Sequence, residues 1–386
     1  MNNIEPFKRV TLKDIAKKTG YSVSAVSHAL KDMPDISQEA KTYIKNCANR
    51  LGYIGNSSAS SLRTGRSKSV AVILGDLANP HFAFVAKEIE QHLSKTDYYT
   101  FIMSTNESKS NEKKAITTAF DKNVDGIIIC PSQNPEGTEN IELLKKYNIP
   151  FVLIGRHFKN YKANSVVPND FKSGYLLGKH ILESGHEKIA YFNTMYPNSS
   201  SIERKNGVLK AIHESDKKIE ISEFFFEQKN HQFEELIDEK NQIRFTAIIA
   251  YNDLIAWTII KHLEQLNKSI PEDISLVGFD NLHSYLPLPF KLTSIAPKKH
   301  IMPQYAVELL LKAIEAQDPS FSKQIVRLVS SAPKLETSIL RNEFSNTLIF
   351  LSIFLLDQLY KNKFISFPIS SLNQKAYPFL KNVLFL

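Results

Sequence analysis

Residues 10–30 read VTLKDIAKKTGYSVSAVSHAL, and this stretch decides the fold of the N-terminal part of the 386-residue chain. Thr11 stands three residues before Asp14, which is the spacing of a capping box at the start of a helix. Gly20 ends that helix in a four-residue turn, and Ser22 caps a second helix in which apolar residues recur at helical spacing. Two short helices joined by a glycine-containing turn predict a helix-turn-helix motif.

The residues that follow extend this motif to three helices around one small core. Pro34 breaks the second helix, and Ser37 begins a third whose apolar residues keep helical spacing up to Gly52. Residues 1–68 are also basic, because they hold 12 of the 48 Lys and Arg but 5 of the 40 Asp and Glu. A small basic module typically binds a polyanion by releasing counterions from phosphates. A solubilising tail would carry the same charge, but it would not show the three-helix pattern.

Composition excludes several classes of protein. Two cysteines, Cys47 and Cys130, exclude a disulfide framework and a cysteine-built metal site, and they suit a reducing cytoplasm. The first residues contain no apolar core of a secretory signal, and no apolar run reaches the roughly 18 residues that span a bilayer. We therefore expect a cytoplasmic protein that has no membrane segment, and the predicted helix-turn-helix motif makes a nucleoid-associated protein the expectation.

From residue 70 onward, short apolar runs alternate with amphipathic stretches, which predicts parallel α/β sheets with helical crossovers. Consecutive hydrophobic residues indicate buried strands at 70–74, 98–103, 126–130, 151–154, 188–192, 246–250 and 274–279. Helices are expected at 82–95, 111–121, 172–184, 202–214, 254–266 and 301–315. This length of alternation exceeds one ordinary core.

Motifs of common enzymes are absent from this α/β region. It contains no GxGxxG, no P-loop, no GxSxG elbow and no HExxH pair. An enzyme hypothesis would rest only on fold-level analogy, which is a weak basis. We therefore expect a non-enzymatic protein that needs no cofactor and no metal.

Several stretches together resemble the LacI/GalR family of bacterial transcriptional regulators. They begin with the stretch at 10–30 and with LGYIGNSSASSLRTGRSKSVAVI at 51–73. They continue in order through NPHFA, VDGIII, IPFVLIGR, ESGHEKIAYF, YNDLIA and IPEDISLVGFD, so that the resemblance covers residues 9–341. Any one piece alone would be unspecific, whereas all of them in this order are specific.

The resemblance implies the domain organisation. It implies an all-α helix-turn-helix headpiece of the lambda-repressor type at 9–54 and a hinge at 55–68. A two-lobed α/β effector domain of the type I periplasmic-binding-protein fold then follows at 69–341. In this arrangement the first lobe holds 70–167 and 295–325, and the second lobe holds the intervening residues and the last strand.

The resemblance places the recognition helix at about residues 22–30. It puts Val23, Ser24 and His28 at base-reading positions, where valine can pack on a thymine methyl and the polar side chains can bond base edges. Two alternatives stay open, because Val23 also fits the apolar stripe of the helix and His28 could be a solvated surface residue. Thr11, Ser22 and Ser27 are better placed for phosphates, through their hydroxyls and through helix N-terminal amides.

Residues 56–66 are rich in serine and small side chains, and taken alone they are typical of a linker. In the resembled family this segment becomes a short helix when two protomers meet on operator DNA, and a leucine matching Leu62 enters the minor groove. Arg63 keeps positive charge beside it. Gly55 and Ser60 stand where the family usually has proline and often has arginine, so we expect this hinge to order less readily.

The resemblance also implies ligand residues in the cleft between the lobes. Carboxylates accept from sugar hydroxyls, arginine and asparagine donate to them, and an aromatic face covers the apolar side of a sugar ring. Phe82 could instead be helix core, Asp280 could cap its own loop, and Asp253 is expected to be a helix N-cap. The expected effector-binding residues are Asn79, Phe82, Arg156, Asp170, Arg204, Asn252 and Asp280.

Together these features predict a homodimeric repressor that binds double-stranded, pseudo-palindromic operator DNA and responds to a small-molecule effector. The cleft residues suit a sugar, with a faint likeness to regulators that respond to maltose or other α-glucosides. Purine and phosphoprotein corepressors stay open. The alternative function is that of a cytoplasmic sugar-binding sensory protein that acts through protein partners without reading DNA.

Residues 342–386 form a hydrophobic C-terminal extension. Its most apolar stretch, Leu348–Leu356, is too short to span a membrane. We expect either an extension without a specific role or one that packs on the body or on another protomer.

Overall fold

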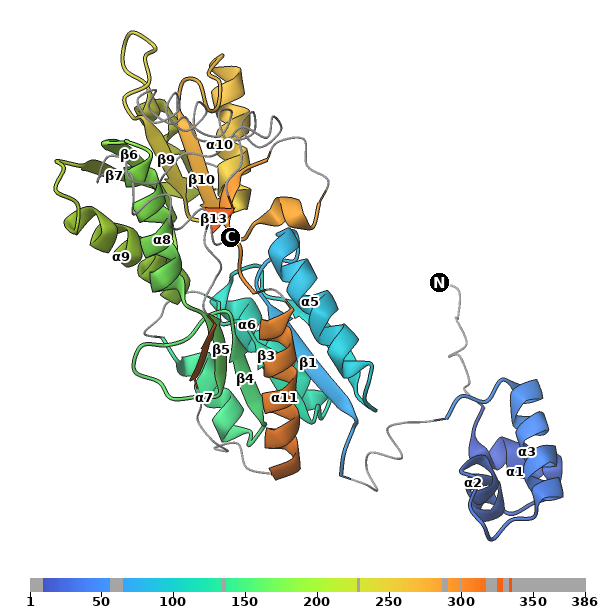
Figure 1. Ribbon diagram of the computed structural model, residues 1–386. Helices are drawn as coiled ribbons and strands as arrows, with labels where there is room; N and C mark the ends of the chain where they lie inside the picture. The colour runs from blue at the N-terminus through green and yellow to red at the C-terminus, as the bar shows by residue number, and fades with distance from the viewer. Residues whose placement is uncertain are drawn as a thin grey trace, which may run out of the picture. The chain divides into compact units, whose positions relative to one another are not determined.

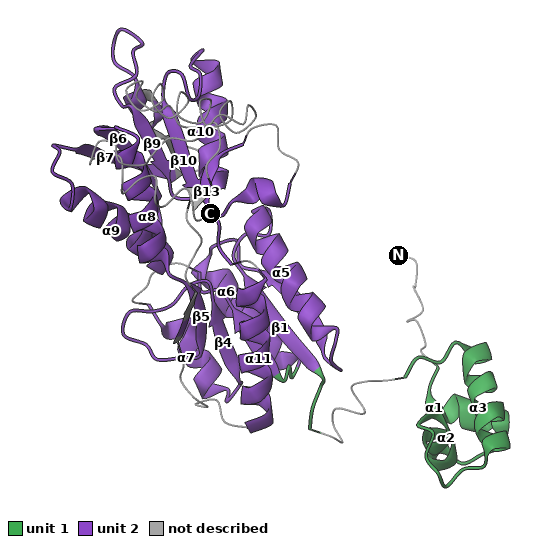
Figure 2. Ribbon diagram, viewed as in Figure 1, with its two compact units in different colours: residues 1–68, 123–125 green, residues 69–122, 126–386 purple. Residues whose placement is uncertain are grey.

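The computed structural model describes residues 10–55, 65–132, 137–227, 230–286, 291–298, 300–316, 325–328 and 333–334. These residues belong to two compact units (Figure 2), one comprising 1–68 with 123–125 and the other 69–122 with 126–386. Leu62 and Arg63 of the predicted hinge, and the C-terminal extension 342–386, lie outside the described residues.

The described part of the N-terminal unit contains α1 (Leu12–Thr19), α2 (Val23–Leu30) and α3 (Gln38–Leu51). The predicted capping box is present, because Thr11 accepts from the Asp14 amide and the Asp14 carboxylate accepts from the Thr11 amide. Gly20 ends α1 with a φ of 78°, which glycine adopts without steric cost. The three helices share one core, formed by Ile15, Val26, Ala29, Ile44 and Ala48.

The larger unit contains two sheets flanked by helices (Figure 1). The first sheet is parallel throughout, in the order β12-β5-β4-β3-β1-β2. Its strands are β1 (Ser69–Leu74), β2 (Tyr99–Ser104), β3 (Gly126–Ile129), β4 (Phe151–Ile154), β5 (Ser165–Pro168) and β12 (Ile325–Leu328). Its helices are α5 (Pro80–Leu93), α6 (Lys109–Asp121), α7 (Glu139–Lys146) and α11 (Ile301–Ala316).

The second sheet has the order β13-β11-β10-β9-β6-β7-β8 and is parallel except for its two outer pairs. Its strands are β6 (Lys188–Thr194), β7 (Glu220–Glu227), β8 (Asn230–His231), β9 (Ala247–Ala250), β10 (Ser275–Phe279), β11 (Thr293–Ile295) and β13 (Pro333–Lys334). Its helices are α8 (Asp170–Glu183), α9 (Ser199–His213) and α10 (Asp253–Gln265), with short 3₁₀ turns at Gln232–Leu236 and Leu282–Ser284.

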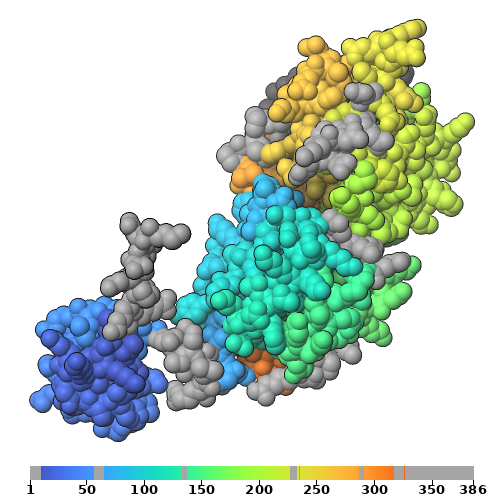
Figure 3. Space-filling view, turned by 180° about the vertical axis from the view of Figure 1, so that it is seen from behind, coloured from blue at the N-terminus to red at the C-terminus, as the bar shows by residue number. Residues whose placement is uncertain are grey.

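The chain passes between these two lobes more than once, and Figure 3 shows both lobes in space-filling form. It leaves the first sheet after β5, forms the second sheet from β6 to β11, and returns to place α11 and β12 in the first lobe. On α11, Ala306 and Leu310 share the core of Val72 and Ile128. The two-lobed arrangement implied by the resemblance is therefore present.

The structure corrects one expectation about the first sheet. The run at 98–103 is expected to be a buried strand, but in β2 the residues Tyr99, Phe101 and Ile102 are 71%, 49% and 43% exposed. The reason is position, because β2 is the outermost strand of its sheet. Helix α7 and the strands β5, β7, β8, β11, β12 and β13 are additions that the sequence patterns do not predict. Within the described ranges, every helix is too short or too polar to cross a membrane.

Candidate functional site

A cavity of about 480 Å³ lies between the two lobes of the larger unit. Loops that follow β1, β2 and β4 line it from the first lobe, and loops that follow β9 and β10 line it from the second. Ligands of open α/β sheets bind at the carboxyl ends of the strands, which is where this cavity lies. Residues contributed by these five loops include Asn79, Glu107, Arg156, Tyr251 and Asp280.

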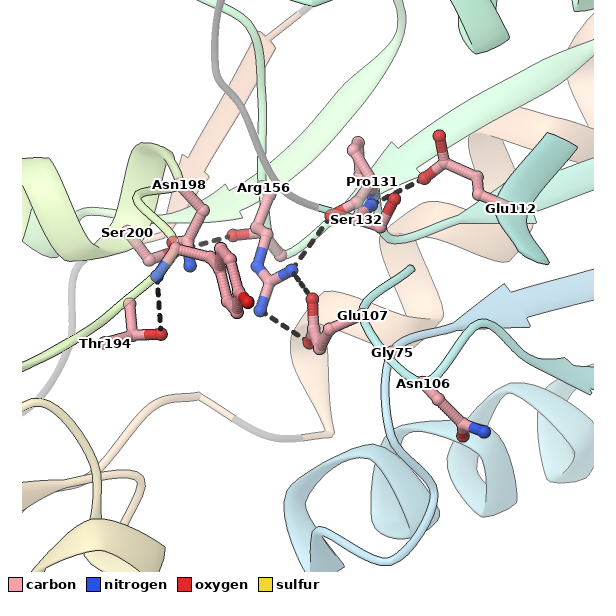
Figure 4. A network of polar contacts seen from close by, with 12 residues as sticks. Gly75, Asn106, Glu107, Glu112, Pro131, Ser132, Arg156, Thr194, Asn198 and Ser200 are labelled. Atoms are coloured by element: carbon pink, nitrogen blue, oxygen red, sulfur yellow. Dashed lines mark hydrogen bonds and ion pairs between the residues drawn. The ribbon is translucent and has the colours of Figure 1, made fainter. Parts of the chain in front are cut away.

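On the first-lobe side, Arg156 and Glu107 form a bidentate ion pair (Figure 4). Nη1 of Arg156 lies 2.6 Å from Oε2 of Glu107, and Nη2 lies 2.9 Å from Oε1. Nη1 also donates to the carbonyl of Pro131 at 3.0 Å. Burial opposes the charge of the guanidinium, but the Glu107 carboxylate outweighs it, so the pKa of Arg156 is raised above its usual range. Arg156 is therefore charged and already paired.

On the second-lobe side, Arg204 of α9 lies between two carboxylates. Its Nε donates to Oδ1 of Asp170 at 2.8 Å, and its Nη2 lies 3.2 Å from Oδ1 of Asp280. Its Nη1 donates to the carbonyl of Tyr251 at 2.7 Å. Burial opposes the charge of Arg204, but the two carboxylates raise its pKa. Burial raises the pKa of Asp170, and Arg204 acts in the opposite direction.

Two glycines allow α8 and α9 to approach closely enough for Asp170 to meet Arg204. A Cβ placed on Gly207 would lie 2.1 Å from the carbonyl oxygen of Phe171 on α8. A Cβ on Gly174 would lie 2.0 Å from the carbonyl oxygen of Arg204 on α9. Both positions therefore need glycine for close backbone approach.

The loop after β10 carries Asp280, and a buried carboxylate holds that loop. Asp253 is 1% exposed, and its Oδ2 accepts from the amide of Leu282 at 2.8 Å while its Oδ1 accepts from the Ser294 hydroxyl at 2.7 Å. The expectation that Asp253 is a helix N-cap is wrong. The cap of α10 is Asn252, whose Oδ1 accepts from the Ile255 amide at 2.9 Å.

The cavity lining holds more carboxylates than guanidinium groups. Asp76, Glu107 and Asp280 face it together with Arg156 and Arg204. The carboxylates of this surface can accept hydrogen bonds from an uncharged ligand. An anionic ligand would find both arginines already paired with carboxylates. Its aromatic members are Phe82, Tyr196, Phe226 and Tyr251. Among the residues that the structure describes, no group of His, Cys, Asp or Glu is placed to hold a metal ion.

Six of the seven predicted effector residues line the cavity: Asn79, Phe82, Arg156, Arg204, Asn252 and Asp280. The seventh, Asp170, lies behind Arg204 and is 3% exposed. Phe82 is 8% exposed and belongs to the core of the first lobe. It is therefore both a core residue of its helix and a lining residue of the cavity.

Sequence patterns miss Glu107, Tyr251 and Asn198 as members of the site. Asn198 forms a capping box with Ser201, a spacing that can be read from the sequence, and its Nδ2 lies 3.2 Å from the Tyr251 hydroxyl. Glu107 has no local signal, because its partner Arg156 lies 49 positions away.

The exposed face of α2 is a candidate nucleic-acid interface. Val23 is 42% exposed, and Ser24 is also exposed, while Val26 is fully buried in the core. Nδ1 of the His28 ring forms a hydrogen bond with Oδ2 of Asp35. Ser22 caps α2 by accepting from the Ala25 amide at 3.1 Å. Of the expected phosphate contacts, Thr11 is exposed at the start of α1 and Ser27 is half-buried on α2.

Comparisons with protein families match both units. The model described as bacterial regulatory proteins of the lacI family matches residues 11–56. The model described as periplasmic binding proteins and sugar binding domain of the LacI family matches residues 67–329.

Individual relatives also match most of this chain. The HTH-type transcriptional repressor PurR of Mannheimia succiniciproducens is 27% identical over 314 residues, which are 80% of this chain and 93% of the relative. The repressor of the same name from Actinobacillus pleuropneumoniae serotype 3 is 27% identical over 323 residues, 82% and 94% of the two chains. A LacI family regulator from Enterococcus faecium with bound ribose is 27% identical and has a TM-score of 0.59, covering 71% of this chain and 100% of its own. The lac repressor dimer bound to operator and the anti-inducer ONPF has a TM-score of 0.70 at 22% identity, covering 86% and 100%.

Proposed function

Since the chain belongs to the LacI family of bacterial regulatory proteins, we propose that it is a DNA-binding transcriptional repressor controlled by an uncharged sugar. The headpiece supplies the DNA contacts, and the cavity between the lobes supplies the ligand site. A protein with this role works in the cytoplasm, on the nucleoid. The domain limits in this proposal are 9–54 for the headpiece, 55–68 for the hinge and 69–341 for the effector domain.

In this function α2 is the recognition helix. Val23, Ser24 and His28 lie on its accessible part and read base edges in the major groove. Thr11, Ser22, Ser27 and Arg63 contact phosphates, and Leu62 enters the minor groove. Two headpieces read the two halves of a pseudo-palindrome, because a dimer with two-fold symmetry requires a site of matching symmetry.

The pairing of the two cavity arginines is the single observation that carries the proposal of an uncharged ligand. Arg156 is paired with Glu107, and Arg204 is paired with Asp170 and Asp280. A phosphorylated or carboxylated effector would have to break these pairs, whereas the hydroxyls of an uncharged sugar can donate hydrogen bonds to Glu107 and Asp280, which line the cavity. The aromatic rings in the lining supply flat apolar faces for a sugar ring.

The ligand acts through the relation between the two lobes. It touches residues from both lobes, so it favours the arrangement of lobes that satisfies both sets of contacts. That arrangement biases the headpieces between states that bind the operator well and poorly. The effector and the operator then change one another's affinity by the same factor.

A homodimer is the assembly that this function requires. The exposed apolar residues of β2, Tyr99, Phe101 and Ile102, offer an edge strand that a second copy can cover.

The test uses thermal shift on the full-length protein with maltose, ribose, glucose 6-phosphate, hypoxanthine and guanine, since a ligand of the native state raises the melting temperature. The stabilising compound is then added to an electrophoretic mobility shift assay with DNA upstream of the protein's own gene. Stabilisation by an uncharged sugar and a changed DNA affinity support the proposal. Stabilisation by the phosphate or the purines alone contradicts the ligand class, and the absence of specific DNA binding contradicts the repressor.

A further inference from the structure

His28, in the last turn of α2, makes a side-chain hydrogen bond to the loop that follows the helix. Its Nδ1 lies 2.5 Å from Oδ2 of Asp35, in the loop between α2 and α3. Both side chains stay accessible, with 41% and 54% of their surface exposed. This hydrogen bond from His28 lowers the pKa of Asp35, so the carboxylate stays ionised.

The loop that carries Asp35 is held in place from both sides. The Met33 amide donates to the His28 carbonyl at 3.0 Å, which folds the loop back over the end of α2. Asp32, at a φ of 58°, accepts from Lys45 Nζ of α3 at 2.6 Å and 2.7 Å through its two carboxylate oxygens. Asp35 therefore meets the His28 ring from a loop that is hydrogen-bonded to both α2 and α3.

An ionised carboxylate can only accept hydrogen bonds, so Nδ1 of His28 must carry the proton. In the uncharged ring Nε2 is then an acceptor, because the bond made by one ring nitrogen fixes the state of the other. In the major groove, adenine N6 and cytosine N4 are amino donors, whereas guanine O6 and N7 and thymine O4 are acceptors.

Resting on the proposed function, we propose that Asp35 is a positioning residue that sets base preference. It holds His28 so that Nε2 accepts from an exocyclic amino group, which selects adenine or cytosine over guanine or thymine at one position of each half-site. Asp35 itself contacts no base in this arrangement.

The experiment selects a random duplex library with the full-length protein in mildly alkaline buffer, and it compares wild type with Asp35→Asn. Asparagine can donate to Nδ1 as well as accept from it, so the ring can present either a donor or an acceptor at Nε2. Asp35→Asn should lower the preference for adenine or cytosine at one position by about fivefold, which is the contribution of about one hydrogen bond. Glu39→Gln is the charge-matched control, because this exposed acid on α3 also loses one negative charge.

Two further variants separate the proposed role from a general electrostatic effect. His28→Ala should lose the same preference at the same position, and adding Asp35→Asn to it should change nothing more. A general effect would raise affinity for all sequences in both Asp35→Asn and Glu39→Gln without changing base preference. Unchanged preference in Asp35→Asn, or a change that persists beside His28→Ala, would overturn this inference alone. If wild type enriched no sequence, the proposed function itself would fall, together with the inference that rests on it.

Discussion

Arg156 follows β4 and Glu107 follows β2, yet their side chains meet in two parallel hydrogen bonds of 2.6 Å and 2.9 Å at the edge of the cavity. Two strands of the sheet, β3 and β1, separate β4 from β2 in space. The pair therefore spans the carboxyl edge of the first sheet and neutralises one of the two cavity arginines.

Glu107→Gln should change which ligands the cavity accepts. The variant removes one negative charge and leaves the Arg156 guanidinium without its ionised partner, so affinity for a sugar phosphate should rise. Affinity for the uncharged sugar should fall by about tenfold, as expected for loss of a charged acceptor. Isothermal titration calorimetry measures both, with Glu139→Gln as the control, since that exposed acid pairs with Lys109 and is not among the lining residues. If the ratio of sugar-phosphate affinity to sugar affinity were the same in wild type and Glu107→Gln, the charge of Glu107 would not select the ligand.

Arg204→Met should destabilise the protein strongly. It keeps most of the side-chain volume but leaves Asp170 and Asp280 buried without their cation, and breaking a buried ion pair in this way costs about 3–5 kcal/mol. Urea unfolding measures the loss. Arg244→Met, at an exposed arginine, should cost less than about 1 kcal/mol. Similar costs for the two variants would show that the buried cluster contributes little.

Gly207→Ala should destabilise through a steric clash between α8 and α9. The added Cβ would lie 2.1 Å from the Phe171 carbonyl oxygen and 2.5 Å from the Tyr175 amide nitrogen, and backbone cannot move aside as a side chain can. Overpacking costs about 1–3 kcal/mol, and we expect the upper end here. Thermal unfolding checks it against Lys210→Ala, at an exposed position of α9. A neutral or stabilising Gly207→Ala would mean that the helices can separate freely.

Cys130 should make stability depend on alkaline pH. Burial raises the pKa of its thiol from 9.0 to about 12. The folded state therefore favours the uncharged thiol, and its contribution to stability is complete below pH 9.0 and is lost as the pH rises to about 12. In this interval wild type should lose about 1.4 kcal/mol of unfolding free energy per pH unit relative to Cys130→Ala. Urea unfolding of both proteins at pH 7 measures the cost of the cavity that alanine leaves. If the unfolding free energies of wild type and Cys130→Ala changed in parallel from pH 9 to 11, the raised pKa of Cys130 would be refuted.

Phe101→Glu should weaken self-association. Phe101 is 49% exposed on the outer strand of the first sheet, and a charge there would have to be buried or repelled in a dimer that covers this strand. Sedimentation velocity should show a dimer for wild type and a larger monomer fraction for the variant. Phe171→Glu is the control, because Phe171 is 42% exposed on α8 of the other lobe. A variant as dimeric as wild type would place the interface elsewhere.

Local sequence patterns predicted what depends on neighbouring residues. The Thr11–Asp14 capping box, the Gly20 turn and the Ser22 cap form as predicted, because each uses hydrogen bonds between residues a few positions apart. The same local reasoning predicted the strand β2 but was wrong about its burial, and it was wrong about Asp253 as the cap of α10. A continuous apolar run is the same whether its strand is central or outermost, and a carboxylate beside a helix start does not reveal which partner it meets.

The sequence by itself determined the helix-turn-helix headpiece and the alternation of strands and helices, and its family resemblance implied six residues that line the cavity. Only the tertiary structure decided that Glu107 neutralises Arg156, that Asp170 stands behind Arg204, and that Asp35 lies within hydrogen-bond distance of His28. The physical reason is that charge pairing depends on distance in space. Strand order and close helix packing bring together two pairs that lie 49 and 34 positions apart in the chain, and the fold of one loop turns Asp35 toward His28.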